Sequence, residues 1–201
     1  RKLGLLVGVL SSELPVSLAV NVCGELAAGG EGEVEVLRLS ALRGLFSAVI
    51  EDPVTFVNAP ALAAERGVEA SISTASESPN HRSVVDVRAV CADGATVNVA
   101  GALSGPQMVE KIVQINGRNL DLRAEGVNLI INYDDQPGAL GKIGTLLGGA
   151  GANILAAQLS QDADGEGATV MLRLDRPVPA DVLAEIGRAV AAVTLEVVDL
   201  S

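Results

Sequence analysis

The chain has 201 residues, a formal net charge of −11 and 49% hydrophobic residues, so it can bury one large core or two small ones. The acidic balance and the scarcity of aromatic residues argue against nucleic-acid binding, which relies on cationic side chains and base stacking. No run of about 18 apolar residues is free of glycine and charge, so no membrane span is expected. Cys23 and Cys91 lack the spacings of zinc and iron–sulfur sites, so we expect no metal and two reduced thiols in a cytoplasmic protein.

Residues before about 125 predict a domain that mixes helices with antiparallel strands. Apolar runs typical of strands occur at 16–22, 34–39, 68–75, 84–90, 96–103 and 108–115. Helical spacing of apolar residues occurs at 40–49 and 55–66, and Gly67 is placed to end the second helix. Residues 27–33 indicate a Gly- and Ala-rich loop, and the Asp-Gly pair at 93–94 predicts a hairpin turn. The chain starts at Arg1 without Met, which indicates a fragment or a processed product.

Residues 126–201 predict a β-α-β-β-α-β order, which is the ferredoxin-like unit with both helices on one face of a sheet. Strands are expected at 127–133, 154–161, 168–174 and 195–200, with a turn at 162–167. Pro137 begins the first helix, and glycines at 148, 149 and 151 end it; the second helix follows Pro179 and extends to about 192. The fold class is therefore α+β in both parts. Such a sheet leaves one face and its edges uncovered, so we expect at least a dimer with ligand sites where copies meet.

The segment 131–140 is the most informative part of the chain. A buried strand runs into a polar turn and then into a helix with Pro137 and Gly138 at its mouth. Free N–H groups and the helix dipole favour an anion there, such as a small carboxylate. The carboxyl group of Asp135 and the amide of Asn153 add partners for an amine. This combination suggests a binding site for an amino acid.

Several blocks of sequence resemble known families. The sequence Asp-Gln-Pro-Gly-Ala-Leu at 135–140, with Gly-Ala-Asn-Ile at 151–154, resembles an ACT domain, a small effector-binding module of amino-acid metabolism. Residues 3–6, 37–46, 77–82 and 111–118 resemble the C-terminal half of the long, actinobacterial-type D-3-phosphoglycerate dehydrogenases, and the likeness covers essentially the whole chain. The resemblance implies an intervening, or allosteric substrate-binding, domain at 1–125 and a serine-binding ACT domain at 126–201.

In that family, serine binds between ACT domains of neighbouring subunits and inhibits the enzyme. The residues that the resemblance places at the L-serine site are Tyr133, Asp135, Gly138, Ala139, Leu140 and Asn153. Their chemistry suits a zwitterion, because a carboxylate binds the ammonium group and backbone N–H groups bind the carboxylate. The alternative is that Asp135 and Asn153 are ordinary cap and turn residues.

A group of cationic residues stands out in this acidic chain: Lys111, Arg118 and Arg123 lie close together in the sequence. By resemblance they form, with Arg173, a site between the two domains for phosphate or a phospho-substrate such as phosphohydroxypyruvate. Arginine forks bind phosphate in a bidentate manner and lysine adds a point charge. The alternative is scattered, solvated surface charge. The family pattern has a histidine after the Arg118 position, and Asn119 stands here instead, which implies a weakened contact.

No catalytic residue is expected in the chain. His81 is the only histidine, and it has neither a nucleophile motif nor an orienting carboxylate beside it, so a hydrogen-bonding role in a loop is favoured. The glycines at 29, 30 and 32 and those at 148, 149 and 151 do not form a dinucleotide fingerprint. By resemblance, NAD belongs to the other half of the full-length enzyme, and this segment needs no cofactor and is inactive by itself.

Three functions remain compatible with the sequence. The first is the regulatory part of an NAD-dependent D-3-phosphoglycerate dehydrogenase of L-serine biosynthesis, in a cytoplasmic homo-oligomer held together through both domains. The second is a regulatory or β-type subunit of an iron–sulfur L-serine dehydratase, whose cluster cysteines would lie on another chain. The third is a stand-alone ACT module that binds an amino acid.

Overall fold

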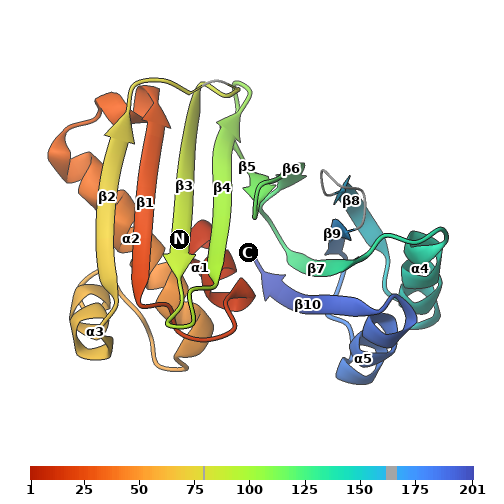
Figure 1. Cartoon of the computed structure of the whole chain (residues 1–201). Helices are drawn as coiled ribbons and strands as arrows, with labels where there is room; N and C mark the ends of the chain where they lie inside the picture. Colours follow the sequence, from red (N-terminus) through yellow and green to blue (C-terminus); the bar gives the residue numbers. More distant parts are fainter. Residues whose placement is uncertain (79, 162–166) are drawn as a thin grey trace. The chain divides into compact units, whose positions relative to one another are not determined.

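The computed structural model describes residues 1–78, 80–161 and 167–201, which form two compact units, Arg1–Gly117 and Arg118–Ser201 (Figure 1). The first unit contains α1 (Lys2–Leu10), β1 (Ser17–Gly24), the 3₁₀ turn η1 (Glu25–Ala28), α2 (Glu31–Val49), α3 (Ala59–Arg66), β2 (Glu69–Ala75), β3 (Ser83–Val90), β4 (Thr96–Ser104) and β5 (Val109–Ile115). The second contains β6 (Arg118–Arg123), β7 (Val127–Asp134), α4 (Ala139–Gly149), β8 (Ile154–Gln161), β9 (Gly167–Leu174), α5 (Ala180–Ala189) and β10 (Ala192–Asp199). The α+β class is confirmed for both parts. The domain boundary predicted at 125/126 stays a prediction, and it falls between β6 and β7 of the second unit.

The sheet of the first unit has the strand order β2-β1-β3-β4-β5. The β1–β2 pair is parallel and the other neighbouring pairs are antiparallel. Leu18, Val20 and Val22 of β1 alternate with more exposed residues, so one face of the strand is buried. The helices α1 and α2 contact β1 to β4, and Figure 1 shows them on one face of this sheet.

Glycines let α1 and α2 approach each other closely. A Cβ atom added to Gly4 would lie 2.0 Å from the Ala41 carbonyl oxygen, and one added to Gly44 would lie 2.0 Å from the Arg1 carbonyl oxygen. Leu42, Leu45 and Phe46 complete the buried side of α2. The helix pair is therefore packed backbone against backbone, and no larger residue fits at these glycines.

The strand predicted at 34–39 is wrong, because these residues belong to α2. Alternating Glu and Val residues at 33–36 resemble a half-buried strand, but the buried positions continue from Val34 to Ala41 and Leu45 at helical spacing. Val36 is 50% exposed, and Glu35 pairs with Arg38 one helical turn later. Part of the predicted loop at 27–33 also lies in α2. The sequence reading assigned no element to α1.

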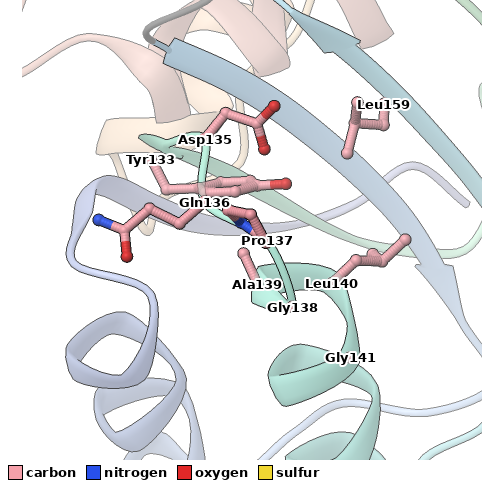
Figure 2. Close-up of a pocket in the computed structure, with 9 residues that line it drawn as sticks. All are labelled: Tyr133, Asp135, Gln136, Pro137, Gly138, Ala139, Leu140, Gly141 and Leu159. Carbon is pink, nitrogen blue, oxygen red and sulfur yellow. The ribbon is translucent and has the colours of Figure 1, made fainter.

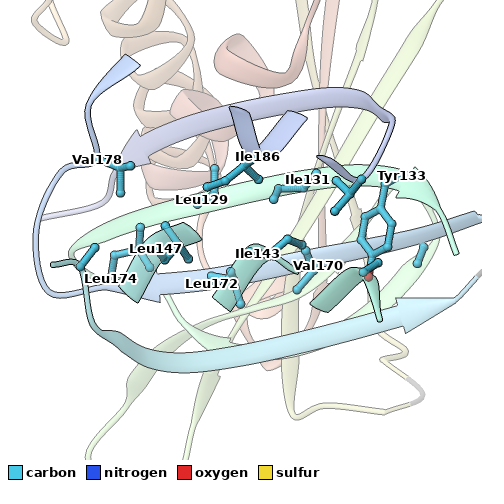
Figure 3. Close-up of a cluster of buried hydrophobic side chains, with 14 residues drawn as sticks. Leu129, Ile131, Tyr133, Ile143, Leu147, Val170, Leu172, Leu174, Val178 and Ile186 are labelled. Atoms are coloured by element: carbon cyan, nitrogen blue, oxygen red, sulfur yellow. The ribbon is translucent and has the colours of Figure 1, made fainter. Parts of the chain in front are cut away.

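The second unit confirms the predicted β-α-β-β-α-β order from β7 to β10. The sheet has the order β10-β7-β9-β8, and every neighbouring pair is antiparallel. Figure 3 shows the core between this sheet and the two helices, with Leu129 and Ile131 from β7, Leu172 from β9, Ile143 from α4 and Ile186 from α5. Buried residues of β7 and β9 thus place both helices on the same face.

The ends of the second unit differ from the predictions in detail. The second helix ends at Ala189, because Ala191 adopts a positive φ of 50° that a continuing helix does not allow, and β10 then begins at Ala192. Arg118–Arg123 forms β6, whose Leu120 and Leu122 are buried. Most of the turn predicted at 162–167 lies outside the described residues. Among the helices in the described ranges, none has the length and apolar character that a membrane crossing requires.

Candidate functional site

The N-terminus of α4 opens at the end of β7. Gly138 precedes the helix with a φ of 88°, a conformation that favours glycine, and no side chain caps the helix. The Ala139 N–H group donates to the Gln136 carbonyl oxygen over 3.1 Å. Within the described residues, the N–H groups of Leu140 and Gly141 have no hydrogen-bond partner. Two free donors and the positive end of the helix dipole therefore point out of α4, as the sequence predicted for an anion site.

A pocket of about 450 Å³ lies in front of this helix end. We call it the α4 pocket, and it is lined by Tyr133, Asp135, Gln136, Pro137, Gly138, Ala139, Leu140, Gly141 and Leu159. Figure 2 shows Asp135 above the ring of Tyr133, with Leu140 and Leu159 on the side of the pocket toward which the tyrosine hydroxyl points. Five of the six residues predicted for serine binding therefore line one pocket. Pocket size and lining suit a small polar molecule.

Tyr133 contributes a polar atom without a partner. Only 2% of its surface is exposed, and its hydroxyl group is buried without a hydrogen-bond partner in the described structure. Burial, and then the charge of Asp135, raise the pKa of the hydroxyl, so it stays protonated at neutral pH. A buried hydroxyl that lacks a partner is costly, so its place in the α4 pocket points to a ligand that accepts a hydrogen bond from it.

Asp135 follows the last residue of β7 and is half-buried. Its Oδ2 atom accepts a hydrogen bond from the side-chain amide of Gln161, at the end of β8. The amide is neutral, so it brings no positive charge to the carboxylate. The α4 pocket thus combines a carboxylate, a hydroxyl donor and free backbone N–H groups, which together match a zwitterion with an ammonium and a carboxylate group.

Asn153 does not lie in the α4 pocket. It follows α4, whose 11 residues separate the two helix ends by roughly 16 Å. Strand register agrees, because Ile154 aligns through Leu174 with Val127, at the end of the sheet opposite Tyr133. The Asn153 N–H group donates to the Asp175 carboxylate over 2.9 Å. Within one chain, Asn153 and Asp135 therefore occupy opposite ends of the same sheet.

An apolar strip borders the α4 pocket. Leu140, Leu155 and Leu159 are 44%, 51% and 38% exposed. Leu155 and Leu159 belong to β8, which is an edge strand of the sheet in the second unit. The strand β6 contacts β8 as well, and exposed leucines on such an edge strand are typical of a surface that another chain covers.

The structure divides the predicted cationic residues between the two units. Lys111 is half-buried in β5 of the first unit, whereas the three arginines belong to the second. Arg123 is exposed on β6. Arg173 of β9 forms an ion pair with Glu125, and its Nε atom is buried without a partner. The guanidinium group of Arg173 is thus already engaged by a carboxylate of its own chain.

Arg118 lines a second pocket, of about 380 Å³, whose other lining residues are Asn132, Tyr133, Asp134, Gly167, Ala168, Val193 and Thr194. The Asn132 amide donates to the Thr194 hydroxyl over 2.6 Å and its oxygen accepts from Thr169. Neither Arg123 nor Arg173 is among the described residues that line this pocket. The predicted anion site therefore stays a prediction. Of its predicted residues, Arg118 lines this second pocket.

Glu13, Cys91 and Asp93 place three possible metal-ligand atoms within 4.8 Å of one another. Each group has a local partner: the Cys91 thiol donates to the Glu13 carbonyl oxygen, the Glu13 carboxylate accepts the Ala92 N–H, and Asp93 accepts the Ala95 N–H. These hydrogen bonds belong to a hairpin turn and the segment that caps it, and they explain why the three side chains lie close together. The expectation of no metal stays a prediction.

The predicted serine site left out four residues that line the α4 pocket, Gln136, Pro137, Gly141 and Leu159, and it left out Gln161, which does not line the pocket but bonds to Asp135. Of these, Leu159 and Gln161 lie far from the helix mouth in the sequence. Both belong to β8, which β9 separates from β7 in the sheet. No sequence motif links them to Asp135, because the strand order that brings them together depends on tertiary pairing. The alternation of β8 residues was the only available signal, since it places Leu159 and Gln161 on the same face.

Comparisons with known proteins match both units. A family model described as the D-3-phosphoglycerate dehydrogenase intervening domain matches residues 1–116, and an ACT-domain model matches residues 127–191. The chain is similar to proteins named D-3-phosphoglycerate dehydrogenase. The one from Mycobacterium tuberculosis (strain ATCC 25618 / H37Rv) is 75% identical over 201 residues, covering 100% of this chain and 38% of that protein.

Two further relatives carry the same name. The protein of Mycobacterium leprae (strain TN) is 72% identical over 200 residues, covering 100% of this chain and 37% of the relative. The protein of Bacillus subtilis (strain 168) is 28% identical over 199 residues, covering 99% of this chain and 37% of the relative. The chain thus spans well under half the length of the relatives it matches.

Proposed function

The chain belongs to the D-3-phosphoglycerate dehydrogenase family, and we propose that it is the regulatory part of such an enzyme, which binds L-serine in the α4 pocket as a feedback inhibitor. The family matches confirm the resemblance seen in the sequence and favour the dehydrogenase over the dehydratase and the stand-alone module. The longer enzyme would be an NAD-dependent oxidoreductase of serine biosynthesis in the cytoplasm. The glycines of this chain that follow β1 and lead into α2, Gly29, Gly30 and Gly32, do not have the Gly-x-Gly-x-x-Gly spacing of a dinucleotide site, so NAD would belong to the rest of the longer enzyme.

The buried, unpartnered hydroxyl of Tyr133 at the mouth of an uncapped helix is the observation that carries the serine proposal. The serine carboxylate would accept hydrogen bonds from the N–H groups at the start of α4. The ammonium group would bind the free oxygen of Asp135, and the Tyr133 hydroxyl would donate to a ligand oxygen. Leu140 and Leu159 would border the serine side chain.

A second copy of the chain would complete the site. If two β8 edges pair in antiparallel fashion, the start of one strand meets the end of the other. Asn153, just before β8, would then approach Gln161 and Asp135 of the other copy. The pairing would also cover the exposed Leu155 and Leu159. A serine site shared by two copies accounts for both the isolation of Asn153 within one chain and the apolar strip.

Serine could inhibit only through a difference in affinity. A ligand shifts an equilibrium between two arrangements when it binds one of them more tightly. Closing the paired site around serine supplies such a difference, because only paired copies present Asp135 and Asn153 together. The homo-oligomer and its allosteric response are therefore parts of one proposal.

The cationic residues support a second ligand, a phosphate or a phospho-substrate such as phosphohydroxypyruvate. Arg118 lines a pocket, and the guanidinium group of Arg173 already binds the carboxylate of Glu125. A planar guanidinium that binds a carboxylate suits a phosphate oxygen equally well. Arg123 of the same unit would add positive charge. An incoming anion has to displace Glu125 from Arg173, so affinity at this site is expected to be modest.

The decisive test replaces Asp135. Removing a charge-assisted hydrogen bond costs about 1.5–3 kcal/mol, so Asp135→Ala should raise the Kd for L-serine by roughly 10- to 150-fold in calorimetric titrations. The matched control is Asp134→Ala, which removes the preceding carboxylate on the opposite side of β7 and should leave the Kd within about twofold. Equal serine affinity in the Asp135→Ala variant and the unmodified chain, with both folded, would reject the α4 pocket as the serine site.

A further inference from the structure

Three residues form one row across the helix-covered face of the sheet in the second unit. Tyr133 of β7 pairs with Ala168 of β9, and Ala168 pairs with Gln161 of β8. Directly paired residues point to the same face, so the three side chains lie side by side at the strand spacing of about 4.8 Å. The middle residue, Ala168, is small and buried, so the longer side chains of the tyrosine and the glutamine lie on either side of it.

The carboxylate of Asp135 occupies the end of this row. Asp135 lies two residues after Tyr133 and is bonded through Oδ2 to the Gln161 amide. No shared backbone segment forces these two side chains together, since 26 residues separate them in the chain. The hydrogen bond is therefore what orients the carboxylate across the α4 pocket rather than out into solvent.

We infer that Gln161 is a positioning residue of the serine site: its neutral amide holds one oxygen of Asp135 so that the other oxygen receives the ligand's ammonium group. This inference rests on the function proposed for the α4 pocket and adds a residue outside the predicted set. The assignment concerns the orientation of Asp135, because Gln161 itself is not among the residues that line the pocket.

The neutrality of the amide matters as much as its ability to donate. A lysine or arginine at this position would also bind Asp135, but it would neutralise the carboxylate and occupy it with a cation. A ligand ammonium group would then face a satisfied ion pair. A glutamine fixes the geometry and leaves the negative charge available, which is the condition for binding a cationic group at a fixed place.

The position of Gln161 also ties the carboxylate to the strand edge that a second copy would cover. Gln161 is the last residue of β8, the edge strand, and its neighbour on the same face, Leu159, lines the α4 pocket. Pairing of β8 with another copy would fix the backbone of Gln161. Through the Gln161–Asp135 hydrogen bond, the orientation of the ligand-binding carboxylate thus depends on how firmly the edge strand is held.

Two substitutions in the full 201-residue chain separate positioning from a structural role. Gln161→Met keeps the length of the side chain and removes the donor, so the Kd for L-serine should rise roughly 2- to 10-fold. Gln161→Lys keeps a donor and adds a charge, so it should weaken serine binding more than Gln161→Met does while leaving the unfolding midpoint of the ligand-free chain unchanged or higher. The matched control is Gln158→Met on the opposite face of β8, which should leave the Kd within about twofold.

A spectroscopic signal completes the test. In a ¹⁵N-labelled chain, the side-chain NH₂ resonances of Gln161, assigned by their loss in Gln161→Met, should shift saturably as L-serine is added. If the unmodified chain binds serine and both Gln161 variants bind it equally well, the positioning role is refuted while the serine site stands. If Gln161→Lys binds L-serine as tightly as the unmodified chain does, the role is also refuted, because any hydrogen-bond donor at position 161, charged or neutral, would then be sufficient. Absence of serine binding in the unmodified chain would instead refute the proposed function itself.

Discussion

Replacing Tyr133 with phenylalanine should make the ligand-free chain more stable and serine binding weaker. The tyrosine ring is part of the core of the second unit, where phenylalanine fills the same space. Only the hydroxyl group is lost, and in the ligand-free chain that group is buried without a partner. Structural residues rarely show this combination, because a substitution that weakens binding usually leaves the fold less stable or unchanged.

The magnitude follows from the burial of the hydroxyl. Tyr133 is 2% exposed, so the hydroxyl has lost its water, and a buried polar group that lacks a partner costs about 1–3 kcal/mol. Tyr133→Phe should raise the free energy of unfolding by up to this amount. A gain of about 1 kcal/mol moves the urea midpoint upward by roughly 0.3–1 M, because the denaturant slope of a small domain is about 1–3 kcal/mol per molar.

Urea unfolding followed by circular dichroism measures the stability change, and calorimetric titration measures serine binding. The loss of one neutral hydrogen bond to the ligand should weaken binding by roughly 2- to 13-fold. A lower urea midpoint for Tyr133→Phe without ligand would show that the hydroxyl already has a stabilising partner in the free chain. That result would remove the main argument for a ligand at this position.

Three other substitutions test the packing, the electrostatics and the anion site. Gly44→Ala should destabilise the first unit by about 1–3 kcal/mol or more, because the new Cβ would lie 2.0 Å from the Arg1 carbonyl oxygen. Burial raises the pKa of Asp86, so its ionised form is penalised: the stability of the first unit should fall as pH rises from about 4 through the raised pKa, and Asp86→Asn should remove this dependence. Glu125→Gln frees Arg173, so phosphate affinity measured by calorimetry should rise roughly two- to fivefold.

Matched controls sharpen two of these tests. Gly32→Ala lies in the same helix as Gly44 with no atom within 4 Å of the added Cβ, so it should stabilise the chain by roughly 0.5–1 kcal/mol. Equal effects of the two glycine substitutions would contradict the close helix contact. Glu185→Gln removes an exposed charge from α5 without touching Arg173. A gain in phosphate affinity in this variant as large as in Glu125→Gln would show a general charge effect instead of competition at Arg173.

Local sequence signals predicted the second unit well because its elements are bounded by strong turn and cap residues. Strand β8 was predicted at its observed bounds. The helix α4 was predicted to begin at Pro137 and begins two residues later, at Ala139, because Gly138 has a positive φ; the glycines after Leu147 mark its end as predicted. The first unit was harder, since the alternating Glu and Val residues near Val34 fit a strand as well as the start of a helix. Tertiary packing of α2 against α1 decided between the two.

The candidate site was predictable only in part, for a geometric reason. Tyr133, Asp135 and Leu140 are close in sequence and remain close in space, so a local motif could predict their pocket. Gln161 reaches Asp135 through strand order, which no local signal contains. Asn153 was expected beside Asp135, and the register of β8 instead places it at the other end of the sheet, where only another copy could bring the two together.

Calorimetric titration of the unmodified chain with L-serine, with D-serine and glycine as comparison ligands, tests whether this chain is a serine-binding regulatory part. We expect saturable binding of L-serine and much weaker binding of D-serine, because the carboxylate, ammonium and side chain must reach α4, Asp135 and the leucine-lined wall at the same time. We also expect L-serine to stabilise the pairing of two copies. A folded chain that releases no heat with L-serine at any temperature tested, and whose oligomeric state does not respond to it, would refute serine binding in the α4 pocket.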